Sequence, residues 1–408
     1  NPLRAVSLCC LNQHACGYSV LLDACQQDGN NSLSIMGITV RALDNRRRLD
    51  RQRFIAVDRA IYDGDPNWVA PLRVDMHTLL NPRKHPFHEH AEVSLFVAER
   101  DGRPVGRVAA HVNHRHAERW DDGAGFFGFF ECADDAQAAR ALFEKAASFL
   151  REWGCTTMRG PFSWSPNEEI GLLVDGFDSP PVIMMPYNRP YYPALLEQAG
   201  FMGRKDLLAY EIRDAANIPD RLARGVELIK KRHNVTVRTI DMKRFDEEVD
   251  LAKWVYNEAW EENWGAVPMT DAEFDHLAKD LKMVVDPVLV LFAYVGDELA
   301  GFSLAVPDAN RAIQRANGRL LPFGIIRMMT ELRRINYVRV LALGVLEPFR
   351  NRGIDIAMYY QTFRNGLEKG YHSGEFSWIL EDNYAMRNAL EKFGAHPSKT
   401  YRVYERDL

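Results

Sequence analysis

Two groups of residues in this sequence have the types and spacing that chemistry requires. The first is the segment 345–355, VLEPFRNRGID, which joins an apolar strand-like run to an amphipathic helical pattern. A helix that starts directly after a strand leaves backbone N–H groups unpaired, and its dipole favours an anion there. Arg350 and Arg352 add positive charge, and Gly353 allows a phosphate to approach the backbone. The segment therefore predicts a phosphate-binding loop.

The second group lies in residues 160–169, GPFSWSPNEE, where Asn167, Glu168 and Glu169 stand between apolar stretches. Carboxylates in such a place can hold an amine or remove its proton. Met184 and Met185, further along the chain, supply flexible apolar surface. We interpret this group as a pocket for an amine with an apolar body. A solvated loop with ordinary helix caps is the alternative interpretation.

A repeat indicates which elements must position these groups. A hairpin-like pattern, an Asn before a helical pattern and a Gly after it each occur twice. The separations are 195 residues between Gly106 and Gly301, 195 between Asn188 and Asn383, and 194 between Gly200 and Gly394. Because separate motifs keep nearly one offset, the chain is predicted to contain two copies of one fold.

Each copy is predicted to run from a first strand through a helical region, a hairpin and another strand into an amphipathic helix. A further strand, a second helix and a last strand then close the copy. The amphipathic helices carry apolar residues at helical spacing, namely Leu142, Ala146, Phe149 and Trp153 in the first copy and Ile356, Tyr360, Phe363 and Leu367 in the second. The predicted fold class is α/β in the α+β sense, with two tandem domains that each contain a mixed, mostly antiparallel sheet flanked by helices.

Domain boundaries follow from the same repeat. Residues 1–35 precede the first predicted strand and lack its periodicity, so we expect an extension outside the fold. Residues 36–214 are predicted to form the first domain and residues 233–408 the second. Residues 215–232 are predicted to be a linker that enters a short basic helix.

Composition narrows the possible function classes. The 408 residues are 47% hydrophobic and 26% charged, as in a globular protein with a packed core. A net charge of −5 gives no general attraction to nucleic acid. With 6 cysteines and no long apolar run, a reduced, cytoplasmic protein without membrane spans is expected. Several histidines near residues 85–116 lack companions at metal-ligand spacing, so no metal site is predicted.

The phosphate-binding loop and the order of elements resemble the GNAT superfamily of acyl-CoA-dependent N-acyltransferases. The pyrophosphate loop of that family reads Arg/Gln-x-x-Gly-x-Gly/Ala, and residues 350–354 follow this pattern. The resemblance covers residues 37–408 and implies acyl-CoA as co-substrate and an amine as acceptor. The residues that it implies for acyl-CoA binding are Leu343, Val345, Arg350, Asn351, Arg352, Gly353, Ile354 and Asn383.

Two departures from the family pattern affect these expectations. Asp355 stands where the family has Gly or Ala, and it would repel a pyrophosphate if it pointed inward. A basic turn in which Asp355 stabilises the helix start is the alternative. At the matching place in the first copy, Glu131, Asp134 and Asp135 would oppose a pyrophosphate. Only the second copy is therefore expected to bind CoA, which leaves the first copy available for the acceptor.

Acyl transfer to an amine needs a base, an oxyanion donor and sometimes an acid for the leaving thiolate. Many GNAT enzymes supply that acid from a Tyr in the last helix, and Leu390 occupies the matching position here. Tyr384 and Tyr401 are the candidate substitutes. Glu381 is the candidate base in the second copy, with a surface carboxylate as the alternative. Glu168 and Glu169 complete the set of candidate catalytic residues.

Within the superfamily, residues 65–72, 125–131 and 187–192 are similar to the bacterial ceramide-synthase-like group. That resemblance implies transfer of a fatty acyl group from CoA to the amine of a long-chain, sphingoid-type base. Two other functions stay open. One is acetyl transfer to a small polar amine, and the other is binding of acyl-CoA or lipid without catalysis.

Residues 319–329, RLLPFGIIRMM, interleave arginines with apolar bulk. This pattern suits a helix that lies on a membrane surface or lines a channel for an acyl chain. A core helix with snorkelling arginines is the alternative. Peripheral contact with the inner face of a membrane therefore stays open beside the cytoplasmic location.

Overall fold

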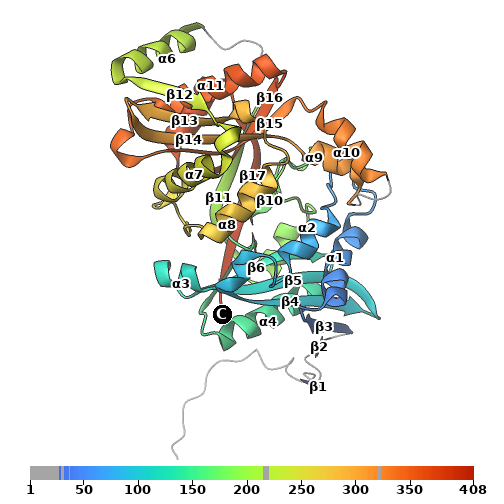
Figure 1. The fold of residues 1–408 in the computed structure, drawn as a ribbon. Helices are drawn as coiled ribbons and strands as arrows, with labels where there is room; N and C mark the ends of the chain where they lie inside the picture. Colours follow the sequence, from blue (N-terminus) through green and yellow to red (C-terminus); the bar gives the residue numbers. More distant parts are fainter. Residues whose placement is uncertain (1–26, 29–31, 36, 215–219, 319–322) are drawn as a thin grey trace, which may run out of the picture.

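The computed structural model of the chain describes residues 27–28, 32–35, 37–214, 220–318 and 323–408 (Figure 1). The long strands in these ranges form one continuous sheet that carries helices on its faces. Each half of the chain contributes one parallel strand pair, and the other pairs are antiparallel. The predicted fold class, two tandem units with mixed and mostly antiparallel sheets, is confirmed.

The first half contains the hairpin, the amphipathic helix and the closing strand that the repeat predicts. Its elements are β3 (Ile38–Leu43), α1 (Arg48–Tyr62), α2 (Arg73–Leu79), η1 (Pro86–Glu89), β4 (Ala91–Arg100), β5 (Arg103–Asn113), α3 (His114–Trp120), β6 (Ala124–Cys132), α4 (Ala136–Glu152), β7 (Thr157–Gly160), β8 (Phe162–Ser163), β9 (Glu169–Ile170), β10 (Leu172–Asp175), α5 (Tyr192–Gln198) and β11 (Met202–Ile212).

The second half repeats this order with its own additions. Its elements are α6 (Asp220–His233), β12 (Val235–Thr239), η2 (Met242–Arg244), α7 (Phe245–Trp260), α8 (Asp271–Leu281), η3 (Pro287–Leu289), β13 (Val290–Val295), β14 (Glu298–Pro307), α9 (Asn310–Ala316), α10 (Gly324–Leu332), β15 (Tyr337–Val345), η4 (Glu347–Phe349), α11 (Ile354–Lys369), β16 (Ser373–Leu380), α12 (Tyr384–Lys392) and β17 (His396–Asp407).

Two insertions distinguish the halves. Between its hairpin and β15 the second half has two helices, α9 and α10, where the first half has only α3. The first half instead inserts β8, β9 and β10 between β7 and α5. The extra residues of the second half come before β15, and those of the first half come after β7. The two additions nearly cancel, so the separation between equivalent residues is again close to 195 at the last helix of each half. Both insertions matter for function, because one carries Glu168 and the other carries α10.

The two halves exchange their last strands. Strand β17, from the second half, pairs with β7 and with β11 of the first half. Strand β11 in turn pairs with β16 of the second half. The strand order across the junction is therefore β7-β17-β11-β16. Neither half completes its own sheet, so the predicted domains share one hydrogen-bonded framework.

The predicted extension needs a correction at its end. Residues 32–35 form β2 (Ser32–Ile35), which pairs with β3, and β1 (Gln27–Asp28) pairs with β2. This part of the segment belongs to the sheet because its backbone groups complete a hairpin with the first predicted strand. Four of the 6 cysteines, Cys9, Cys10, Cys16 and Cys25, lie outside the described residues, as do residues 215–219 of the predicted linker. The basic helix after the linker is α6.

Candidate active site

A cavity lies where the parallel strands of the second half diverge. Strands β15 and β16 pair from Tyr337 with Ser373 to Val340 with Phe376. Beyond that point, Leu341 of β15 and Trp378 of β16 both line a cavity of about 140 Å³. The edge of β15 that faces β16 has no ladder partner there in the described part of the chain. The divergence of the strands thus opens a space inside the molecule.

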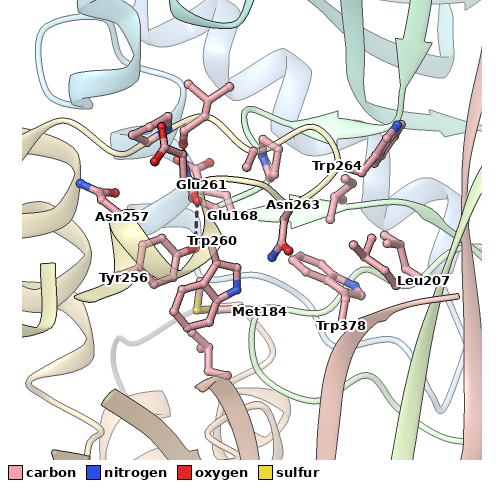
Figure 2. A pocket seen from close by; sticks show the side chains of 18 of the residues that line it. Glu168, Met184, Leu207, Tyr256, Asn257, Trp260, Glu261, Asn263, Trp264 and Trp378 are labelled. Atoms are coloured by element: carbon pink, nitrogen blue, oxygen red, sulfur yellow. Dashed lines mark hydrogen bonds between the residues drawn. The ribbon is translucent and has the colours of Figure 1, made fainter. Parts of the chain in front are cut away.

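Both halves of the chain line this cavity, as Figure 2 shows. Most of the lining is aromatic or aliphatic, and a few polar groups stand among these side chains. The first half supplies Pro166, Asn167, Glu168, Ile170, Met184 and Leu207, and the second supplies Tyr256, Asn257, Trp260, Glu261, Asn263, Trp264, Ala266, Val267, Pro268, Arg339, Leu341, Trp378 and Leu380. Such a lining suits a ligand with an apolar body and one or two polar groups.

Asn167 links the loop around residues 164–168 of the first half to the second half by hydrogen bonds. The Tyr256 hydroxyl of α7 donates a hydrogen bond to Asn167 Oδ1 at 2.9 Å, and Asn167 Nδ2 donates to the carbonyl of Val267 at 3.1 Å. The Tyr256 ring also stacks on Trp260, with ring centroids 4.6 Å apart. The loop that the sequence predicts as an acceptor pocket is therefore held against the opposite wall of the cavity.

Arg339 holds together two further walls of the cavity. It is a site residue that is absent from the predicted set. Its guanidinium is buried and donates to the Met184 carbonyl at 3.0 Å and to Ser377 Oγ at 3.1 Å. It also lies over the Trp378 ring, 5.3 Å from the centroid. Arg339 thus joins the methionine segment of the first half to β16. An arginine inside the apolar strand YVRVLALGV was the signal that could have found it.

Glu168 is the acidic group of the cavity with the most unusual surroundings. Its Oε2 atom is buried and has no hydrogen-bond partner among the described residues. Its Oε1 atom lies 3.4 Å from Nε2 of His85, a histidine that is itself buried. Burial, together with the nearby carboxylates of Glu273 and Glu169, raises the pKa of the Glu168 carboxyl well above its usual range. Glu168 is therefore a group that readily takes up a proton.

Trp378 supplies a hydrogen-bond donor to the same cavity. Its Nε1 atom is buried and finds no acceptor within the described ranges. Buried polar groups in proteins are nearly always paired, so this donor is available to a polar group of a substrate. The sequence analysis named no oxyanion donor. The only signal was a Trp within the strand after the amphipathic helix.

The predicted phosphate loop has the geometry of an anion cradle. It runs from η4 to the start of α11, where Gly353 adopts φ +76° and no side chain caps the helix. The backbone N–H groups from residue 351 to residue 356 donate no hydrogen bond to any described residue. Several donors at the positive end of a helix dipole are thus free for an anion.

The equivalent helix of the first half, α4, has backbone N–H groups at its start that are already hydrogen-bonded. The Asp135 side chain accepts hydrogen bonds from the N–H groups of Gln137 and Ala138, so the start of α4 is already capped. Asp135 also pairs with Arg100 at 2.7 Å. The contrast between a capped α4 and an uncapped α11 supports the expectation that only the second half binds a phosphate.

Glu131, the other acid at this place, points into the protein. It accepts hydrogen bonds from the hydroxyls of Tyr62 and Tyr192, both at 2.7 Å. Burial, opposed by Arg107, raises the pKa of the Glu131 carboxyl to about 7. The first half has therefore filled the space near its loop with its own side chains.

The structure gives Gly353 a second physical role beside the predicted one. A Cβ atom at this position would lie 2.7 Å from Cδ1 of Ile229, a residue of α6. The positive φ favours glycine here, and a side chain at this position would have to displace the flexible end of Ile229, which is a packing role beside the predicted one. Arg350 reaches back to the carbonyls of Val345 and Ala259, and Arg352 reaches the carbonyl of Pro348.

The structure does not bring Glu381 or Tyr384 into the cavity. Glu381 is exposed, accepts a hydrogen bond from the N–H of Asp206 at 3.3 Å and lies 3.9 Å from Lys205 Nζ. Tyr384 is 65% exposed at the start of α12. Asn383 caps that helix by accepting from the N–H of Met386. These placements match the surface alternative that the sequence left open for Glu381.

The remaining predicted residues lie in three places: on the edge of β15, at the surface and in the interior. Leu343 and Val345 lie on the part of β15 that extends beyond its pairing with β16. Glu169 is exposed and does not line the cavity. The Tyr401 hydroxyl is buried without a partner in the described chain, and burial raises its pKa well above the usual range, so its proton is held firmly.

Comparisons with known proteins agree with this geometry. The fold covers 91% of this chain and 98% of a tandem GNAT protein from the clavulanic acid biosynthesis pathway, with a TM-score of 0.55 and 13% identity. It covers 91% of this chain and 96% of a GCN5-related N-acetyltransferase from Sphaerobacter thermophilus, with a TM-score of 0.52 and 14% identity. No protein-family model matches the sequence. The molecule has the tandem GNAT fold.

Two curated relatives are similar over nearly their whole length. The sequence is 38% identical over 368 residues to the protein named bacterial ceramide synthase from Caulobacter vibrioides, covering 88% of this chain and 94% of that protein. It is 35% identical over 385 residues to Protein YghO of Escherichia coli, covering 93% of this chain and 97% of that protein. The chain belongs to the family of these two proteins and is an acyltransferase of the GNAT type.

Proposed function

We propose that the protein transfers an acyl group from acyl-CoA to a primary amine held in the cavity. One observation carries the proposal: a buried acceptor, Glu168 Oε2, and a buried donor, Trp378 Nε1, both lack partners among the described residues that surround a single cavity. A base and an oxyanion donor are the two groups that acyl transfer to an amine needs.

The acyl-CoA site in this proposal follows β15. The N–H groups of residues 351–356 hold the pyrophosphate, with Arg350 and Arg352 at its rim. The pantetheine arm of acyl-CoA then runs along the unpaired edge of β15. It passes Val345 and Leu343 toward Leu341, which lines the cavity. Asp355 lies in the first turn of α11, where an acidic residue also favours the helix dipole.

The proposed reaction uses the two unpaired groups in sequence. Ionised Glu168 takes a proton from the protonated amine, and the neutral amine nitrogen then attacks the thioester carbonyl carbon. Trp378 Nε1–H donates to the oxyanion that forms. The carbon–sulfur bond breaks as the carbonyl is restored, the electron pair leaves on the CoA sulfur, and the surplus proton on the nitrogen passes to that thiolate, which gives the amide and free CoA. A thiol titrates near 8.5, so the thiolate can leave without an acid, which agrees with Leu390 in place of a Tyr.

We infer that the acceptor is a long-chain amine. The cavity lining is mainly aromatic and aliphatic, and the relative from Caulobacter vibrioides is named for ceramide synthesis. A cavity of about 140 Å³ is smaller than an ordinary ligand pocket, so it would enclose the amine and the first carbons of such a substrate. The rest of such a substrate would extend beyond this cavity.

Release of CoA and formation of N-acyl product test this function. The purified protein is given palmitoyl-CoA with sphinganine and, separately, acetyl-CoA with spermidine, and products are identified by mass spectrometry. We expect turnover of the lipid pair. Preference for the polar pair would overturn the lipid acceptor, and binding of acyl-CoA without turnover of either pair would overturn the enzymatic proposal.

The variant Trp378→Phe tests the proposed oxyanion donor. It removes the N–H and keeps an aromatic ring beside Arg339. We expect kcat to fall by about 10²–10³. The affinity for acyl-CoA should stay within a small factor, because the phosphate contacts lie elsewhere. A normal kcat would show that another group stabilises the oxyanion.

A further inference from the structure

The helix α10 presents an apolar strip to solvent. Phe323, just before the helix, is 65% exposed, and within it Ile326 is 59%, Met329 55% and Ile325 40% exposed. These four belong to a short list of exposed large hydrophobic side chains in the described chain, and they fall within seven consecutive residues. No side chain of α10 is buried. The alternative that this segment is a core helix is therefore wrong.

Arginines flank the strip. Arg327, Arg333 and Arg334 are exposed, and none of them forms an ion pair with a described residue. Glu331 is the acid of the helix, and it faces Arg315 of α9 at 4.0 Å. The protein as a whole is acidic, with a net charge of −5. This positive charge is thus concentrated beside exposed apolar side chains, on a helix that lies at the edge of the molecule (Figure 1).

We propose that α10, with Phe323 before it, docks the protein onto the surface of an anionic lipid bilayer. A helix with an apolar face and flanking arginines lies in the interface of such a bilayer, where the side chains enter the acyl region and the arginines meet lipid phosphates. Among the described residues, no helix is long and apolar enough to cross a bilayer.

The small size of the strip favours lipid over a second copy of the chain. A stable protein interface buries about 800 Å² on each partner and is built around a packed apolar centre. Four side chains on a nine-residue helix provide much less than that. Three unpaired arginines at the same place would also repel the same arginines of a symmetric copy.

The position of α10 in the fold supports a role outside the core. It is the second of two helices between β14 and β15, whereas the first half has the single helix α3 at the equivalent place. It packs on α9, and its exposed face contributes nothing to the packing of the sheet. Residues 319–322, the first part of the predicted membrane segment, lie outside the described residues. The proposal concerns lipid binding alone and does not depend on the proposed reaction.

Co-sedimentation with vesicles tests the proposal without any catalytic step. The full-length protein is mixed with vesicles of phosphatidylglycerol and phosphatidylcholine, or of phosphatidylcholine alone. We expect binding to the anionic vesicles, weakened when NaCl is raised from about 0.1 to about 0.5 M. The double variant Ile326→Asp, Met329→Asp should bind at least tenfold more weakly, and Arg327→Gln, Arg333→Gln, Arg334→Gln should abolish the preference for anionic vesicles.

The matched control is Leu228→Asp on α6, which is also a basic helix with an exposed apolar residue, 68% exposed. This control should bind vesicles like the unchanged protein, and the melting temperature of every variant should stay near the original because the altered side chains are exposed. Equal vesicle binding by the α10 variants would overturn the proposal. So would a concentration-dependent dimer in sedimentation velocity that the double variant dissolves, since the occupant would then be a second copy.

Discussion

Nε2 of His85 lies 3.4 Å from Oε1 of Glu168, and both residues are largely removed from solvent. Burial lowers the pKa of His85 from 6.5 to about 3 and raises that of Glu168. At neutral pH the imidazole is therefore uncharged, and the carboxyl is easily protonated. The pair connects the segment before η1 to the cavity, so the histidine can hold one carboxyl oxygen while the other faces the substrate.

The variant Glu168→Gln should remove most of the acyl transfer. The amide keeps the shape of the side chain but cannot take a proton, so kcat should fall by about 10²–10⁴ while acyl-CoA affinity is retained. The control is Glu261→Gln, because Glu261 lines the same cavity but is half exposed. Steady-state rates and calorimetry separate the two effects. Equal losses in both variants would remove Glu168 from the role of base.

The same variant should change the pH dependence of stability. The folded protein keeps the Glu168 proton above the ordinary carboxyl pKa of 4.5, at which the unfolded chain loses it. Since the folded state then binds more protons, this residue lowers the free energy of unfolding as pH rises from about 4.5 toward the raised pKa. Gln does not titrate, so the stability of Glu168→Gln relative to the unchanged protein should increase with pH in urea denaturation. A constant difference would contradict the raised pKa.

His85 should act in the opposite direction at acid pH. Its folded pKa of about 3 lies below the ordinary histidine pKa of 6.5, so the unfolded state binds more protons between these values. The free energy of unfolding therefore falls as pH drops through this window. The variant His85→Gln should lessen the fall, although His111, with a pKa of about 3, keeps part of it. His114→Gln, at a half-exposed histidine outside the cavity, serves as the control variant in acid denaturation.

The phosphate loop is best tested at Arg350. The variant Arg350→Ala should weaken acyl-CoA binding by about 1.5–3 kcal/mol in calorimetry, because a charge-assisted contact is lost. Asp134→Ala, at the loop of the first half, should leave binding unchanged. The reverse result would assign the cofactor to the first half. Gly353 is a poorer position for a test, since any side chain there meets Ile229.

Two truncations separate the predicted extension from the sheet. Removal of residues 1–26 should leave the melting temperature nearly unchanged. Removal of residues 1–36 also deletes β2, which pairs with β3, and should cost about 1 kcal/mol or more of the free energy of unfolding. Thermal denaturation of the two shortened chains measures the difference. Equal melting temperatures would show that β2 contributes little.

Much of the fold could be predicted, because the hairpins and amphipathic helices leave local patterns in the sequence. Ala146 and Leu142 are buried in α4 as predicted, yet Trp153 is 47% exposed because the helix ends at Glu152. In α11 the predicted face is only half-buried, and Met358 and its neighbours are the buried ones. The packing of α6 against α11 is a long-range contact that periodicity does not show.

The site was less accessible to sequence reasoning, for a related reason. Glu168 and the loop at Arg350 could be found because each lies in a distinctive local segment. Trp378 and Arg339 were missed because their importance depends on the divergence of two strands and on contacts with the other half. Glu381 was favoured from its place before Asn383, but nothing local showed that its side chain turns to the surface.

The exchange of last strands also explains why a half without a phosphate cradle persists. Strand β17 obtains its pairing partners β7, β10 and β11 from the first half. A gene that lost the first half would leave β17 and β16 with open edges, which are prone to aggregate. The arrangement is that of a strand-swapped dimer joined into one polypeptide. The first half can therefore lose its phosphate-binding residues during evolution, but its strands must stay because the second half pairs with them.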